Sequence, residues 1–197
     1  MTGVTHFLTR RRDMRNMHEK PGEGTSVVFS RRIGHGQLRG LLLTGGAQYL
    51  RRTEGETRVI MKPVIQLERT GCGIASVAAL AGVRYREMQR VANKLGIVAD
   101  DPRLWSETSY VRRLLQEFGI RPASTEVPFT SWEALPDLAL LAVKWHRKRG
   151  RSFWHWVVFW RGPYGSVVLD SKRELRNHVR TDFGRMKPKW FISVSLI

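Results

Sequence analysis

The most constraining feature of this chain is an almost continuously apolar run, Phe153–Arg161, which reads Phe-Trp-His-Trp-Val-Val-Phe-Trp-Arg. A strand with one face in water alternates apolar and polar residues, whereas a continuous apolar run is typical of a strand covered on both sides. We therefore expect this run to form an interior strand with both of its faces buried.

Further strands are expected on either side of this run. Leu138–Trp145 is a short apolar stretch, followed by a basic segment with a glycine, His146–Ser152, which we interpret as a loop. After the run, Gly162–Gly165 reads Gly-Pro-Tyr-Gly, a turn signal, and Ser166–Asp170 is the returning strand. Trp190–Leu196 is expected to be the last strand.

Three helical patterns precede the strands. Cys72–Ala81 is small and apolar, which suits a helix buried on most sides, while Tyr85–Leu95 and Glu107–Phe118 carry apolar residues at helical spacing. A short helical turn is expected later, where Thr130 and Glu133 fit a capping box. Helices first and an antiparallel sheet afterwards indicate an α+β fold.

The composition changes at Met61 and divides the chain into two parts. Residues 1–60 hold half of the 18 glycines and none of the 7 tryptophans, and their basic clusters show no convincing period. We interpret 1–60 as a basic, Gly-rich N-terminal segment that is poorly ordered or absent from the mature protein, with Met61 as the alternative start. Residues 61–197 suffice for one packed domain.

The charge is strongly basic, with 34 Lys and Arg against 17 Asp and Glu, a formal net charge of +17. Such a surface attracts nucleic acid, anionic lipid and acidic peptides alike, and no nucleic-acid recognition motif accompanies it. The sequence has neither an apolar stretch long enough to span a membrane nor a secretory signal. A cytoplasmic setting and no transmembrane segment are expected.

The only cysteine, Cys72, lies in Thr70-Gly71-Cys72-Gly73, directly before the first predicted helix. One cysteine excludes an internal disulfide and a multi-cysteine zinc site. The flanking glycines allow a sharp turn and leave space for a ligand beside the sulfur, and a helix N-terminus stabilises a thiolate. The alternative is a buried, inert cysteine that acts as a small apolar residue.

Gln66 lies six residues before Cys72. This spacing allows the loop to fold back, so that the Gln66 amide points at the same place as the backbone N–H of Cys72. Two such donors would form an oxyanion hole for a tetrahedral intermediate. The alternative is a solvated glutamine in a loop.

His155 and Asp170 are expected to be neighbours in the sheet. If residues 162–165 form the turn, Arg161 pairs with Ser166, and Asp170 becomes the diagonal neighbour of His155 on the same face. A carboxylate there would fix the tautomer of the imidazole. The alternatives are a core histidine bonded to backbone and a solvated carboxylate at a strand end.

The remaining histidines give no second site. None has metal-ligand spacing with its neighbours, so no metal and no other cofactor is predicted; these residues are His6, His18, His35, His146 and His178.

The order Gln66, Cys72, His155, Asp170 resembles that of the papain-like cysteine peptidases. In particular it is similar to the compact bacterial branch that processes the double-glycine leader peptides of bacteriocins, and to the stand-alone relatives of that branch. The motifs are Gln66 with Thr-Gly-Cys-Gly-Ile-Ala-Ser at 70–76, Trp-His-Trp-Val-Val at 154–158, and Val-Leu-Asp at 168–170. The resemblance covers 61–197.

This resemblance implies a papain-like fold and a role for each matching residue. Cys72 would be the nucleophile, His155 the general base and then acid, Asp170 the residue that orients His155, and Gln66 the oxyanion donor. The chain would then be a cysteine peptidase acting on a peptide or protein, and the basic surface favours an acidic one. Departures are Ile74, where members commonly carry Pro or Leu, and the absence of the transporter to which leader-processing members are generally fused.

Three alternatives stay open at this stage. The same triad on related folds also catalyses deamidation and acyl transfer. A non-catalytic binding module could keep the fold, although an intact set of four residues disfavours it. A basic nucleic-acid-associated protein is the third, and it would show steeply salt-dependent binding to DNA or RNA.

A chain that begins at Met61 is expected to fold and to keep the activity of the full chain, because the first 60 residues lack tryptophan and a hydrophobic period. Thermal melts and rate measurements on both chains check this. A shortened chain that is insoluble, or that melts without cooperativity, would show that the N-terminal segment contributes to the core.

Overall fold

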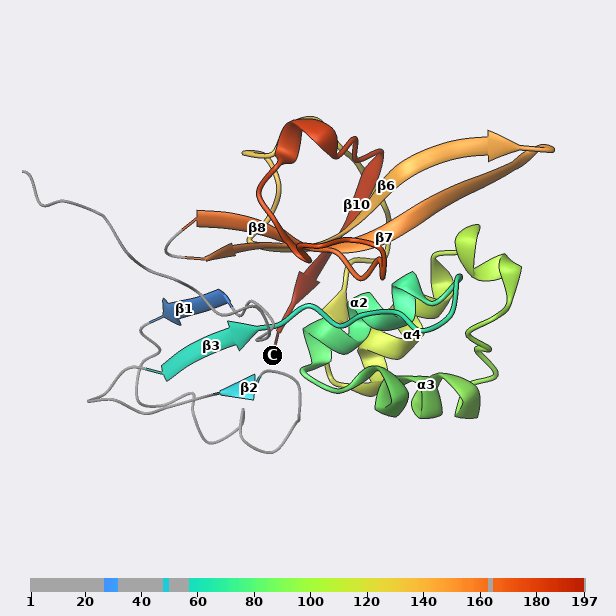
Figure 1. The fold of residues 1–197 in the computed structure, drawn as a ribbon, viewed down its shortest axis with the longest axis horizontal. Coiled ribbons are helices and arrows are strands. Elements are labelled where there is room, and N and C mark those ends of the chain that lie inside the picture. The colour runs from blue at the N-terminus through green and yellow to red at the C-terminus, as the bar shows by residue number, and fades with distance from the viewer. Residues whose placement is uncertain (1–26, 32–47, 50–56, 163–164, 197) are drawn as a thin grey trace, which may run out of the picture.

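The computed structural model describes residues 27–31, 48–49, 57–162 and 165–196. Within these ranges the architecture is α+β, with three α-helices packed against an antiparallel sheet, as the sequence predicted (Figure 1). In the same ranges, no helix is both long and apolar enough to cross a membrane.

The three predicted helices are present with nearly the expected bounds. They are α2 (Cys72–Ala81), α3 (Tyr85–Lys94) and α4 (Ser109–Glu117). Every residue of α2 is buried, because its small side chains allow close packing on all sides. The other two helices each bury a single face. The three helices lie together on one side of the large sheet (Figure 1).

The large sheet has the strand order β4-β10-β6-β7-β8-β9, and β5 also pairs with β10. The strands are β4 (Arg121–Pro122), β5 (Val127–Pro128), β6 (Leu138–Lys148), β7 (Arg151–Gly162), β8 (Gly165–Leu169), β9 (Val179–Arg180) and β10 (Trp190–Ser195). The predicted interior strand is confirmed. Residues 156–159 of β7 are fully buried, with the helices and Trp156 on one side and Phe159 in a second cluster on the other.

The predicted loop His146–Ser152 is wrong. Strands β6 and β7 continue through it to Lys148 and Arg151, and only Arg149 and Gly150 form the turn, both with positive φ (50° and 78°). A two-residue turn of this kind matches the twist of the strands it joins. The hairpin projects beyond the helices (Figure 1). Its charged side chains face solvent, so no apolar alternation revealed it.

The helical turn predicted after Thr130 is also wrong. The segment forms an isolated turn without a helix. The capping residue is Ser131 instead of Thr130, and its Oγ accepts a hydrogen bond from the N–H of Ala134 at 3.2 Å. Pro136 and the start of β6 at Leu138 follow at once, which leaves too few residues to propagate a helix.

A small antiparallel sheet precedes the main domain. It consists of β1 (Val27–Arg31), β2 (Gln48–Tyr49) and β3 (Thr57–Met61), in the order β1-β3-β2. Met61 is the last residue of β3 and is buried in the main core, so the expected division between 60 and 61 falls inside a strand. The expectation that 1–60 is poorly ordered concerns mostly residues outside those described.

Helices α2 and α4 approach each other closely at Gly73. A Cβ added there would lie 2.0 Å from Oη and 2.7 Å from Cζ of Tyr110, a buried side chain of α4. The absence of a side chain at position 73 therefore sets the distance between the two helices.

Gly73→Ala is expected to destabilise the protein by about 1–3 kcal/mol, because the buried ring of Tyr110 must move to admit the methyl group. Urea unfolding measures the loss. Gly184→Ala is the matched control, since a Cβ at Gly184 meets nothing within 4 Å. Equal effects of the two substitutions would contradict the close approach.

Candidate active site

Cys72 is the first residue of α2, so the predicted position at a helix N-terminus is confirmed. Gly71 is the N-cap and supplies no side-chain hydrogen bond. Within the described residues, the backbone N–H of Cys72 has no acceptor, as is usual for the first turn of a helix. The side chain of Cys72 is 1% exposed.

The glycines beside Cys72 do not leave space for a ligand, contrary to the sequence prediction. A Cβ on Gly71 would lie 2.0 Å from the Tyr85 hydroxyl, and one on Gly73 equally close to the Tyr110 hydroxyl. Burial raises the pKa of both phenols, and Glu68, which accepts the Tyr85 hydroxyl hydrogen bond, raises that of Tyr85 further. The charge of Cys72 adds to both shifts. The cysteine is thus flanked by two protonated phenols.

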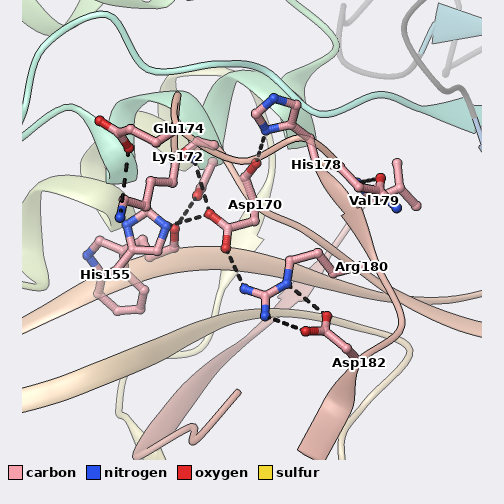
Figure 2. Close-up of polar contacts among 12 residues, drawn as sticks. His155, Asp170, Lys172, Glu174, His178, Val179, Arg180 and Asp182 are labelled. Carbon is pink, nitrogen blue, oxygen red and sulfur yellow. Dashed lines mark hydrogen bonds and ion pairs between the residues drawn. The ribbon is translucent and has the colours of Figure 1, made fainter. Parts of the chain in front are cut away.

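The predicted neighbourhood of His155 and Asp170 is confirmed. Strand β8 pairs with β7 in the expected register, with Arg161 opposite Ser166. His155 Nε2 lies 2.7 Å from Asp170 Oδ1, and the Asp170 carboxylate is fully buried (Figure 2). The imidazole itself is 14% exposed.

Asp170 has a second charged partner, Arg180, which the sequence analysis missed. Arg180 Nη1 donates to Asp170 Oδ2 at 2.9 Å, and the same guanidinium also bonds Asp182 with Nε and Nη2 (Figure 2). The backbone N–H of Lys172 completes the set at 3.1 Å from Oδ1. Strand β9, which carries Arg180, has two residues, too few for any periodic signal.

His178 also approaches this cluster, although the sequence analysis gave it no role. Its Nδ1 donates to the backbone carbonyl of Asp170 at 3.0 Å. This contact holds the backbone of Asp170, while Arg180 and Lys172 hold its carboxylate.

The electrostatics keep Asp170 ionised and His155 protonated. Burial alone would raise the pKa of Asp170, but the hydrogen bond and charge of His155, with the donors from Lys172 and Arg180, lower it well below its usual value. Burial lowers the pKa of His155, but hydrogen bonds to Asp170 and Cys72 and the charges of both outweigh it and raise the pKa to about 9. Since Asp170 holds Nε2, Nδ1 is the nitrogen left for Cys72.

Gln66 is buried, and its amide is engaged within the loop. Its Nε2 donates to the carbonyls of Glu68 and Arg69 at 3.0 and 3.1 Å, and its Oε1 accepts from Ser171 Oγ at 3.0 Å. Gln66 therefore braces the loop before Cys72 against the residue after Asp170. Its role as an oxyanion donor stays a prediction. In that role, Gln66 Nε2 would donate to the substrate oxygen in place of the carbonyl of Glu68 or Arg69.

A cavity of about 590 Å³ opens beside this cluster, with His155 and Gln66 in its wall. Trp105 forms part of the lining, and the Arg69 guanidinium lies over its ring at 5.3 Å from the centroid. The cavity reaches His155, whereas Cys72 is not among the residues that line it.

The comparisons with known proteins add no relative. No family model, curated protein or solved structure matches the chain. The resemblance to papain-like peptidases therefore stays a prediction. In the described part of the chain, no group of three or more His, Cys, Asp and Glu side chains could hold a metal ion.

The raised pKa of His155 predicts how stability depends on pH. A group whose pKa is higher in the folded than in the unfolded chain adds stability that is complete below the unfolded value, near 6.5, and is lost as the pH rises through the folded value, about 9. The contribution of His155 to the free energy of unfolding is expected to fall across this window, by up to about 3 kcal/mol where no thiol titrates against the imidazole.

A comparison of Cys72→Ala with the double variant Cys72→Ala and His155→Gln isolates this effect, because no thiol then titrates against the imidazole and the other groups titrate in both proteins. Urea unfolding at pH 6 and pH 9.5 should show the fall in Cys72→Ala and a much smaller one in the double variant. An identical pH dependence in both would mean that His155 is not held protonated.

Proposed function

We propose that the chain is a cysteine peptidase of papain-like fold, which cleaves amide bonds of a peptide or protein through a thioester on Cys72. The observation that carries the proposal is the placement of His155. It is bound to a buried, ionised Asp170 through Nε2, which leaves Nδ1 for the thiol of Cys72 at the start of a helix. We further propose that it acts in the cytoplasm, a reducing compartment in which a lone thiol stays free.

The protonated His155 favours the thiolate of Cys72 as its counter-ion. In the first step the thiolate attacks the carbonyl carbon of the substrate amide, and His155 transfers its proton to the departing amine. The thioester is then attacked by water, whose proton His155 accepts, so that the acid product leaves and the ion pair is restored. The free backbone N–H of Cys72 is suited to bind the oxyanion in both steps.

Asp170 and Arg180 serve this chemistry indirectly. Asp170 orients His155 and stabilises its imidazolium, as the carboxylate does in serine-type triads. Arg180 fixes the carboxylate and keeps it ionised, and Asp182 in turn orients the guanidinium. Arg180 is thus a positioning residue that acts through Asp170.

The reactivity of Cys72 provides a test that requires no known substrate. Iodoacetamide alkylation of this single cysteine, followed by intact mass, is expected to stay fast at pH 6, where an ordinary thiol is almost wholly protonated. His155→Ala should slow it, and denaturation should restore the pH profile of a free thiol.

One outcome of this labelling would exclude Cys72 as a nucleophile. If native Cys72 reacts more slowly than the denatured chain at every pH, it is a buried structural cysteine. A screen of peptide and protein substrates with wild type and Cys72→Ala complements the labelling, since hydrolysis that survives the substitution would rule out the thioester.

A further inference from the structure

A β-bulge lies directly beside His155. Strands β6 and β7 pair from Leu138 up to Val143 opposite His155, and pairing resumes at His146 opposite Phe153. Lys144 and Trp145 therefore face a single residue of β7. Lys144 has φ = 56°, a left-handed conformation that costs energy for a residue with a side chain. Bulges next to active sites serve to re-aim a side chain.

The side chains of the two bulge residues, Lys144 and Trp145, lie in different surroundings. Lys144 lines the cavity that His155 also lines. Trp145 packs against the main core, with the Lys189 ammonium 5.1 Å from its ring centroid. The strained backbone thus places a cation at the cavity wall near the reacting histidine.

The cavity has an excess of positive charge. Its cations are Arg69, Lys144, Lys172 and Arg173, against two carboxylates. Glu68 binds Tyr85 and Gln89. Glu174, which is 71% exposed, faces one of these cations, since it lies 3.8 Å from the Lys172 ammonium.

Lys144 differs from the other cations, because its ammonium has no hydrogen-bond or ion-pair partner among the described residues, although its backbone carbonyl accepts from His146 Nδ1. Arg173 donates to the Leu67 carbonyl at 2.6 Å, and Arg69 lies over Trp105. The pKa of Lys144 is lowered, first because its ammonium is partly desolvated and second because Lys172 repels it. A bound anion would relieve that repulsion.

We propose that Lys144 and Lys172 form a subsite for a substrate carboxylate, so that the peptide cleaved at Cys72 carries an acidic side chain close to the reacting bond. This inference rests on the proposed function and assigns its substrate class from the cavity beside His155.

A pair of isosteric electrophiles tests the subsite. Iodoacetyl-Glu-NH2 and iodoacetyl-Gln-NH2 carry the same reacting group and differ by one charge. The measured quantity is the alkylation rate of Cys72 by the glutamate compound divided by its rate with the glutamine compound, relative to the same ratio for the denatured chain. In the wild type this ratio is expected to be about five, which corresponds to one partly exposed ion pair. Lys144→Met should bring the ratio near one, and Lys172→Met should lower it.

Lys148→Met is the matched control. Lys148 is on the same strand, is exposed at the hairpin tip and does not line the cavity, so its loss changes the net charge equally while the ratio should persist. Thermal melts verify that each variant is folded.

The outcomes separate the two proposals. A wild-type ratio near one, or the same ratio in all three variants, overturns the subsite while Cys72 still reacts and the proposed function stands. If neither compound labels native Cys72 although both label the denatured chain, Cys72 is not a nucleophile and the proposed function is overturned.

Discussion

The buried carboxylate of Asp170 is the interaction on which the site depends. An ionised group without solvent exposure is costly unless it is paired and hydrogen-bonded. Its partners come from three places in the fold: His155 on β7, the Lys172 N–H after β8, and Arg180 on β9. The charge therefore fixes the geometry of the sheet at this point, because losing one partner would leave a buried carboxylate with fewer donors to compensate it.

The helix side of the site depends on small residues instead of charges. Every residue of α2 is buried, and Gly71 and Gly73 admit the hydroxyls of two tyrosines next to Cys72. Ser76 Oγ donates to the Trp156 carbonyl at 3.2 Å and links α2 to β7. The sulfur and the imidazole are thus positioned by one close-packed interface between a helix and the central strand of the sheet.

The features that repeat along the sequence could be predicted, and those fixed by single contacts could not. The helix Cys72–Ala81 follows from its run of small apolar residues, and the register that joins Asp170 to His155 follows from strand alternation and one turn signal. The partner Arg180 lies on a two-residue strand. The bulge at Lys144 needs a positive φ that no local pattern announces. The Gly73 contact depends on a tyrosine in another helix.

The position of β10 in the sheet has a consequence for biosynthesis. This strand, Trp190–Ser195, is inserted between β4 and β6, and Gln66 bonds Ser171 across 105 residues of chain. During translation α2 leaves the ribosome long before either partner exists. Cys72 therefore has no histidine beside it until β7 has been made, and the sheet around the pair stays open until β10 has followed.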